Sequence, residues 1–224
     1  IAGHPMIYWV WCRAQESAAQ SVVIATDHDA IASVMRDYGA DVALTRSEHP
    51  SGTDRLAEVV RQREWPDDTV VVNVQGDEPL MPAANVDQVA QELLEHPEAS
   101  IATLSEPIES IEDFYNPAVV KVVSDGTGRA LYFSRAPVPF PREGAALQDA
   151  VLRTARRHVG LYAYRCQFLH RYVTWSTASL EQLESLEQLR ALAHGELIRV
   201  VSARVPVPAG VDTEADLQAV RALM

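Results

Sequence analysis

Cysteine is scarce in this sequence: there are two, Cys12 and Cys166, among 224 residues. They lie far apart and form no C-x-x-C pair, which argues against a disulfide framework and a zinc site and favours two buried free thiols. No apolar run approaches the ~20 residues of a membrane-spanning helix, and no secretory signal pattern opens the chain. We therefore expect a cytoplasmic protein without a membrane partner.

Positive charge is also in short supply. Lys and Arg together number 19 against 31 Asp and Glu, which gives a formal net charge of −12. Such a protein repels nucleic acid and anionic membrane surfaces, so we expect neither as a partner. An anionic ligand would need clustered arginines or a metal ion. With 47% hydrophobic and 22% charged residues, the composition is that of an ordinary globular protein with its own core.

The motifs of several common enzyme classes are missing. The sequence contains no G-x-x-x-x-G-K-[ST] phosphate loop, no G-x-G-x-x-G dinucleotide fingerprint, no H-x-x-x-H pair and no G-x-S-x-G nucleophile motif. These absences argue against a P-loop enzyme, a dinucleotide-binding dehydrogenase, a histidine metal site and a serine hydrolase.

Short apolar segments alternate with amphipathic ones through the first half of the chain. They predict helices at 5–17, 29–38, 53–63 and 82–95 and strands at 21–26, 41–44, 69–74 and 99–105. Strands that are apolar throughout need helices on both faces of their sheet. The pattern therefore predicts a three-layer α/β/α fold around a mostly parallel, mixed sheet.

The second half departs from this alternation. Strands at 119–124 and 130–134 flank Asp125-Gly126-Thr127-Gly128, which predicts an inserted β-hairpin. A long helix is expected from Ser179 to Gly195, opened by a capping box between Ser179 and Gln182. The other expected elements are a strand at 158–164, a helix at 166–173, a strand at 198–205 and a helix at 213–224. We interpret 1–224 as one domain with a hairpin insertion at 117–140.

Two acidic residues follow predicted strands. Asp77 comes after a buried strand, in a loop where Gly76 permits close approach to the backbone, and Asp212 joins the last strand to the last helix. Asp77 could instead begin an Asx-turn before Pro79, and Asp212 or Thr213 could serve only as a helix cap. If the two carboxylates meet, they can hold one Mg²⁺, which needs few protein ligands.

Two further polar groups allow two interpretations each. The loop Ser51-Gly52-Thr53-Asp54-Arg55 could only cap the helix that follows, or its backbone could bind the edge of a base. Glu184, Glu187 and Gln188 have i, i+3, i+4 spacing on the predicted long helix, so they share either a solvated face or a binding face.

Seven segments in this order and spacing resemble the 3-deoxy-manno-octulosonate cytidylyltransferase (CMP-KDO synthetase) family essentially from end to end. They are Val22–His28, Ser51–Glu58, Val72–Pro79, Ala130–Ala136, Arg157–Tyr162, Leu186–Arg190 and Gly210–Thr213. The resemblance implies a nucleotide-diphosphosugar-transferase-like fold in which CTP and 3-deoxy-manno-octulosonate (KDO) give CMP-KDO and pyrophosphate for lipopolysaccharide synthesis. It also implies a requirement for Mg²⁺ and a homodimer built partly by the inserted hairpin.

The same resemblance assigns roles on the nucleotide side. Asp77 and Asp212 would hold the metal at the α-phosphate and serve catalysis. Ser51, Gly52 and Gln75, with Asp77, would line the cytidine side.

On the sugar side, the resemblance gives Arg135 a catalytic role in contact with the sugar carboxylate. His158, Tyr162, Glu187 and Gln188 would bind the sugar hydroxyls and orient the anomeric oxygen.

The sequence departs from the family at its start. The segment Ile1 to Met6 corresponds to residues just after the family's first strand and its phosphate-gripping loop, so we expect both to precede Ile1 in the natural protein; His4 stands where the family usually has lysine. Two alternatives stay open: a related cytidylyltransferase for another acid sugar or alcohol, such as a sialic acid or methylerythritol phosphate, and a catalytically silent nucleotide-sugar binding module.

Overall fold

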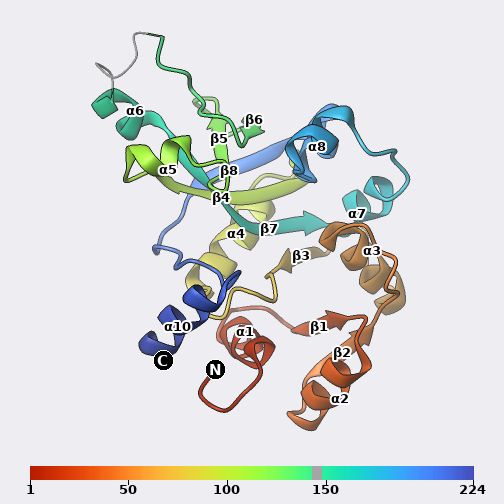
Figure 1. Cartoon of the computed structure of the whole chain (residues 1–224). Helices are drawn as coiled ribbons and strands as arrows, with labels where there is room; N and C mark the ends of the chain where they lie inside the picture. The colour runs from red at the N-terminus through yellow and green to blue at the C-terminus, as the bar shows by residue number, and fades with distance from the viewer. Residues whose placement is uncertain (143–147) are drawn as a thin grey trace.

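The computed structural model describes residues 1–142 and 148–224, and its main feature is a six-stranded mixed sheet (Figure 1). The strand order is β6-β5-β7-β4-β8, and β3 also pairs with β7. Strands β3, β4, β5 and β8 share one direction, whereas β6 and β7 run opposite to it. The bounds are β3 (Val70–Asn73), β4 (Ile101–Pro107), β5 (Lys121–Ser124), β6 (Ala130–Ser134), β7 (Arg156–Arg165) and β8 (Ile198–Ser202).

A smaller parallel sheet lies beside the large one, at the lower right of Figure 1. It consists of β1 (Val23–Thr26) and β2 (Asp41–Leu44), with α1 (Met6–Gln15) and α2 (Asp29–Asp37) close by. Ile24, Met35 and Ala40 form its small buried core. Within the described residues no ladder joins the two sheets. The upstream strand expected from the sequence stays a prediction.

Helices cover both faces of the large sheet. On one face, α3 (Gly52–Arg63), α7 (Cys166–Tyr172) and α9 (Gln188–Ala193) share a core with Tyr162 and Tyr164 of β7. On the other face, α4 (Ala83–Glu95) packs against Leu161 and Ala163, which alternate with the two tyrosines along the strand. This alternation along one strand is what a sheet buried on both sides requires. The predicted three-layer α/β/α fold is confirmed.

The inserted hairpin is present as β5 and β6, and Gly128 in its turn has φ +85°. Two short helices were not expected from the sequence: α5 (Ile111–Tyr115) and α6 (Gln148–Thr154). Both are too short to show a clear helical period. The last helix, α10 (Glu214–Leu223), begins within one residue of its predicted start.

The prediction of one long helix from Ser179 to Gly195 is wrong. The chain forms α8 (Ser179–Glu184) and α9, separated at Ser185, whose φ of +51° lies in the left-handed region. The predicted capping box is wrong too, because the Glu181 carboxylate, rather than Gln182, accepts the backbone N–H of Ala178. Glu184, Glu187 and Gln188 therefore do not share one helix face.

The two cysteines are both unpaired, but they differ in burial. Cys166 is buried, whereas Cys12 is only partly buried, so the expectation of two buried thiols holds for one of them. No helix in residues 1–142 and 148–224 is long and apolar enough to cross a membrane.

Candidate active site

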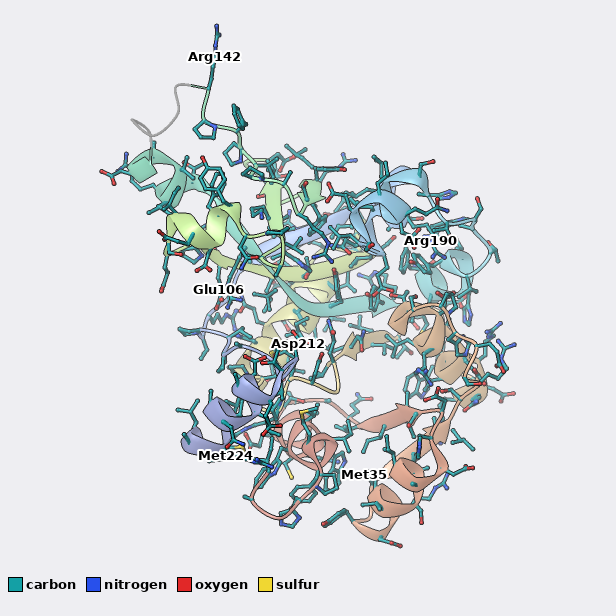
Figure 2. The ribbon with its side chains drawn as sticks, in the orientation of Figure 1. Met35, Glu106, Arg142, Arg190, Asp212 and Met224 are labelled. Atoms are coloured by element: carbon teal, nitrogen blue, oxygen red, sulfur yellow. The ribbon has the colours of Figure 1, made fainter. Side chains whose placement is uncertain are left out.

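The loops that follow β3 and precede α10 meet beyond the end of β3. The backbone N–H of Val211 donates to the carbonyl oxygen of Asp77 over 2.8 Å. A Cβ atom on Gly210 would lie 3.2 Å from that same oxygen. Since Asp212 follows Val211, the fold brings the backbones of Asp77 and Asp212 close together, and the charges of both carboxylates reach Glu78. Figure 2 shows Asp212 near the middle of the molecule, just before α10.

Asp212 does not cap the helix that follows it. Thr213 is the N-cap of α10, and its hydroxyl accepts the backbone N–H of Asp216 over 3.3 Å. The Asp216 carboxylate in turn accepts the backbone N–H and the hydroxyl of Thr213. This reciprocal capping box satisfies the helix start without Asp212. The exposed Asp212 carboxylate is therefore available to a ligand.

Asp77 does not form the alternative Asx-turn. Its Oδ1 atom is buried and has no hydrogen-bond partner in the described part of the chain. A buried carboxylate oxygen without a donor is costly unless a cation or a ligand satisfies it. No group of three His, Cys, Asp or Glu side chains within 1–142 and 148–224 is arranged to hold a metal ion. The unpaired Oδ1 atom of Asp77 and the exposed carboxylate of Asp212 are oxygen ligands of the kind that Mg²⁺ takes, and Mg²⁺ needs few of them from the protein.

Glu78 is a third carboxyl at this edge and is not among the residues predicted from the sequence. One of its oxygens would lie 3.2 Å from a Cβ atom on Gly210. Burial, and the negative charges of Asp77 and Asp212, raise the pKa of Glu78 to about 7. Its position directly after Asp77 in the same loop was the signal that could have found it. We call Asp77, Glu78 and Asp212 the acid rim.

The predicted nucleotide loop has its own hydrogen bonds. Ser51 is the N-cap of α3: its hydroxyl accepts the backbone N–H of Asp54 over 3.2 Å and donates to the Asp54 carboxylate over 2.6 Å. Gly52 lies beside the end of β3, since a Cβ atom there would be 3.7 Å from the Asn73 side chain. The capping interpretation of Ser51 is therefore confirmed, and base binding by the loop stays a prediction.

Gln75 connects the nucleotide side to β7. Its side-chain amide donates to the carbonyl oxygen of Gly160 over 3.0 Å. Gly160 lies between His158 and Tyr162, whose rings are 5.2 Å apart. His158 shares a hydrogen bond of 3.0 Å with Thr103, and burial lowers its pKa to about 3. The imidazole is thus neutral at ordinary pH.

Tyr162 is the most enclosed of the predicted sugar-binding residues. Its side chain is buried in the core below α3 and α7, and its ring stacks on Tyr164 with centroids 5.6 Å apart. Burial raises the pKa of Tyr162 well above its ordinary value. The phenol therefore stays protonated and can act as a hydrogen-bond donor.

Two more predicted sugar-binding residues lie where the break between α8 and α9 meets α9. The Glu187 carboxylate accepts the backbone N–H of Thr53, in the first turn of α3, over 3.4 Å. Gln188 begins α9 with a buried side chain, and its Nε2 atom has no partner among the described residues. An unpaired buried donor such as this can bind an acceptor on a ligand.

Arg135 lies beside the same break but is already engaged. Its guanidinium donates to the carbonyl oxygens of Glu184 (2.7 Å), Pro117 (3.1 Å) and Ser185 (3.4 Å). The Glu184 carboxylate accepts the backbone N–H of Arg135 and the Ser134 hydroxyl, so Glu184 links the hairpin to α8 and does not form a solvated face. Contact between Arg135 and a sugar carboxylate stays a prediction.

These contacts link most of the ten predicted site residues through neighbouring segments of the fold. Val211 joins the two aspartates, the loop of Asp77 carries Gln75 to Gly160 on β7, and Asn73 pairs with Tyr162 in the β3–β7 ladder. Thr53 then links the nucleotide loop to Glu187. Thr103, which holds His158, was missed because a buried threonine in a strand carries no distinctive sequence signal.

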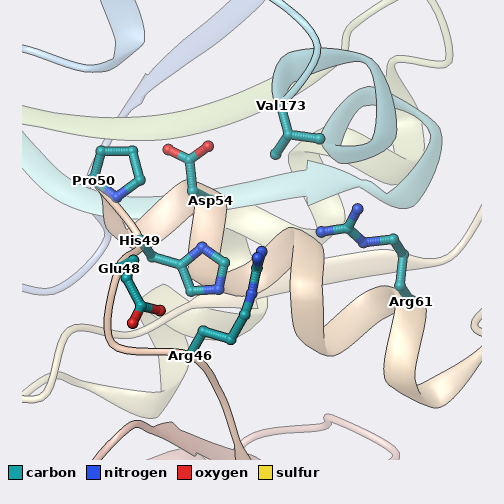
Figure 3. Close-up of a pocket in the computed structure, with 7 residues that line it drawn as sticks. All are labelled: Arg46, Glu48, His49, Pro50, Asp54, Arg61 and Val173. Carbon is teal, nitrogen blue, oxygen red and sulfur yellow. The ribbon is translucent and has the colours of Figure 1, made fainter.

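A separate cavity of about 260 Å³ lies along the outer side of α3 (Figure 3). Its lining residues are Arg46, Glu48, His49, Pro50, Asp54, Arg61 and Val173. None of them is a predicted site residue, although Pro50 precedes Ser51. We place the candidate active site at the linked contacts above, because that region holds the unpaired polar atoms of Asp77 and Gln188.

Comparison with known proteins agrees with the sequence resemblance. A family model described as cytidylyltransferase matches residues 1–198. The chain is 59% identical over 224 residues to 3-deoxy-manno-octulosonate cytidylyltransferase of Chromohalobacter salexigens, covering 99% of this chain and 87% of the relative. It is 55% identical over 228 residues to the Cellvibrio japonicus enzyme of that name, covering 100% of this chain and 89% of the relative.

A solved structure is similar over the same extent. It is that of CMP:2-keto-3-deoxy-manno-octonic acid synthetase complexed with CTP, with a TM-score of 0.91 and 40% sequence identity. The match covers 100% of this chain and 89% of that one.

Proposed function

This chain belongs to the 3-deoxy-manno-octulosonate cytidylyltransferase family of cytidylyltransferases, and on that premise we propose that it joins CTP and KDO to form CMP-KDO and pyrophosphate. The observation that carries the proposal is the hydrogen bond between Val211 and Asp77, which joins the loops that hold the two proposed metal ligands and so supports a shared site for them. The solved neighbour complexed with CTP supports CTP as the nucleotide.

We propose Asp77 and Asp212 as the residues that hold Mg²⁺. The bound ion would offset the negative charge of the phosphate groups. Without a cation, the carboxylates of the acid rim would repel a triphosphate, because both are negatively charged. The net charge of −12 on the chain adds to this repulsion. The buried, unpaired Oδ1 atom of Asp77 supports its role as a ligand.

The remaining site residues would position the two substrates for attack of the sugar's anomeric hydroxyl on the α-phosphorus. Ser51, Gly52 and Gln75 would bind the cytidine, as the α3 N-terminus and the end of β3 lie side by side. Holding two reactants in register removes on the order of 7 to 11 kcal/mol of barrier in well-aligned cases. Little covalent chemistry then falls to the protein.

On the sugar side, neutral His158 and the protonated Tyr162 phenol would bind hydroxyls, while Gln188 would offer its unpaired amide. Arg135 would exchange its backbone acceptors for the sugar carboxylate. That exchange is favourable because a hydrogen bond between charged groups is stronger than one to a carbonyl.

Pyrophosphate release by the full-length protein tests the function. We expect turnover with CTP and KDO, and much slower turnover when UTP replaces CTP or a sialic acid replaces KDO. Faster turnover with another acid sugar would favour a related cytidylyltransferase. Calorimetric binding of CTP and KDO without pyrophosphate release would instead favour a silent binding module.

We also propose a homodimer formed through the hairpin, and a cytoplasmic location in keeping with two unpaired cysteines. Support for the dimer comes from β6, an edge strand on which Leu131 is 56% exposed, and from Phe140 nearby in sequence, which is 74% exposed. Exposed apolar side chains at a sheet edge are typical of an interface.

Light scattering coupled to gel filtration tests the dimer. We expect a dimer for the native protein and a monomer for Leu131→Glu, because a buried carboxylate would oppose association. Leu223→Glu, at another exposed leucine, on α10, serves as the control and should stay dimeric. A monomeric native protein would contradict the proposal.

A further inference from the structure

The break between α8 and α9 needs support from elsewhere in the fold. Ser185 holds a left-handed conformation that residues other than glycine rarely adopt. The segment after it, which carries Glu187 and Gln188, begins a helix of six residues, too short to be stable alone. Something outside this segment must therefore fix where Glu187 and Gln188 lie.

A buried ion pair spans the break. The Glu181 carboxylate in α8 accepts two hydrogen bonds from the Arg190 guanidinium in α9, from Nε over 2.8 Å and from an Nη over 2.6 Å. Both side chains are buried, and Glu181 also accepts the backbone N–H of Ala178. Such a two-point contact fixes the orientation of its partners as well as their distance.

Tyr172 of α7 extends this support to the predicted sugar-binding segment. The Arg190 guanidinium lies over the Tyr172 ring, 4.3 Å from its centroid. The Tyr172 hydroxyl donates to the backbone carbonyl oxygen of Glu187 over 3.2 Å. We call Glu181, Arg190 and Tyr172 the Arg190 framework. Figure 2 shows Arg190 where α7 and α8 approach one another.

We propose that the Arg190 framework positions the sugar-binding segment Glu187–Gln188 and thereby sets the affinity for the sugar acid. The inference rests on the proposed function. None of the three side chains need touch substrate: Tyr172 holds the backbone of the segment, and Glu181 and Arg190 hold together the helices on either side of it. Gln188 is the residue whose placement matters most, because its Nε2 atom is buried and unpaired.

The effect should be confined to the sugar. The nucleotide loop has hydrogen bonds of its own: Ser51 and Asp54 bond each other at the start of α3, and His49 bonds Glu58 beside it. The charge of Arg190 also reaches Asp54, so a variant that keeps Arg190 gives the cleaner test. Among the described residues, one hydrogen bond joins the segment to this loop, from the Thr53 N–H to Glu187, and it is long at 3.4 Å. A shift of the segment should therefore raise the KM for KDO while leaving the KM for CTP almost unchanged.

The mildest test is Tyr172→Phe in the full-length protein. It keeps the ring below Arg190 and removes only the hydroxyl that donates to Glu187. We expect the KM for KDO to rise about fivefold, as suits the loss of one buried hydrogen bond, and the KM for CTP to stay within about twofold.

A stronger test compares two buried arginines. Arg190→Met removes the ion pair, and we expect a KM for KDO raised about tenfold or more, partly restored in Arg190→Lys, which keeps the charge. Arg165→Met is the control, since Arg165 is also buried but donates to the carbonyl oxygens of Leu93, Ala99 and His96. Arg165 pairs with Val70, at the opposite end of β3 from Asn73. The Arg165→Met variant should therefore have lower thermal stability but an unchanged KM for KDO and for CTP.

Three outcomes are decisive. A selective rise in the KM for KDO in Tyr172→Phe, with neither KM changed in Arg165→Met, supports the proposal. Native values in Tyr172→Phe overturn it, even if Arg190→Met fails to fold. A parallel rise in the KM for KDO and the KM for CTP in Tyr172→Phe also overturns it, because that pattern indicates that the whole site has lost order. If the native protein does not turn over KDO at all, the proposed function fails first, and the two failures are thereby distinguished.

Discussion

The starts of α3 and α10 have similar sequences but leave different groups free. Each opens with a hydroxyl residue followed three positions later by an aspartate: Ser51 and Asp54 in α3, Thr213 and Asp216 in α10. In α3 the predicted ligand-binding residue, Ser51, is itself the cap. In α10 the cap is the neighbour of the predicted ligand, which leaves Asp212 free.

The difference shows that a polar residue beside a helix start is available to a ligand only when another group satisfies the backbone. A helix start presents four N–H groups without intrahelical acceptors, and the nearest side-chain oxygen normally accepts one of them. The Asp212 carboxylate stays free because the Thr213 hydroxyl accepts the backbone N–H at the start of α10. The contrast divides the predicted site into engaged residues, such as Ser51 and His158, and free ones, such as Asp77, Asp212 and Gln188.

The largest expected effect concerns the free carboxylates. Asp77→Asn and Asp212→Asn should each lower the rate of pyrophosphate release by about a hundredfold or more, because each removes half of the protein's charge at the proposed cation site. Thermal stability should hold or rise, since these carboxylates repel Glu78. Calorimetric titration with Mg²⁺ and CTP provides a second readout.

Asp216→Asn is the matched control four residues from Asp212. It weakens the capping box of α10, so it should lower the melting temperature and spare turnover. If Asp216→Asn abolished activity while Asp212→Asn did not, the division into engaged and free carboxylates would be wrong.

The next effect concerns His158, an engaged residue. Its pKa of about 3 in the folded state lies below the ordinary value of 6.5, so the unfolded chain binds a proton more readily. Its contribution to stability is therefore complete above pH 6.5 and is lost as the pH falls towards 3, with a slope approaching about 1.4 kcal/mol per pH unit. Urea unfolding measures the free energy of unfolding at pH 7.5 and at pH 5. Between these two pH values, that free energy should fall less in His158→Phe than in the native protein. An equal fall in both would show that the imidazole is accessible to protons in the folded state.

The smallest effects concern the α3 start. Ser51→Ala should cost about 1 kcal/mol of stability through the lost cap.

Gly52→Ala should leave stability nearly unchanged, because the added Cβ would make only an ordinary 3.7 Å contact with Asn73. A raised KM for CTP in Gly52→Ala would then report directly on a nucleotide that approaches the backbone. An unchanged KM for CTP would remove Gly52 from the binding site.

Much of the fold could be predicted because local patterns and tertiary packing agree. The strand at 41–44 and the helix ending at Arg63 were placed to the residue, and the Asp125–Gly128 turn located the hairpin. The helix expected from Ser179 to Gly195 failed because helical periodicity passes through Ser185 without a glycine or proline to mark the break. Buried partners, Glu181 and Arg190, stabilise that break from residues on either side of it.

The sequence by itself determined the alternation of helices and strands, the family, and the residues that could carry the chemistry, because periodicity, turn residues and motif spacing are local properties of the chain. Only the tertiary structure decided which of those residues are free. Whether Asp212 or Thr213 caps α10, whether Asp77 finds a hydrogen-bond partner, and whether Arg190 reaches Glu181 depend on groups brought close by folding, and the free energy of a polar group depends on its actual neighbours.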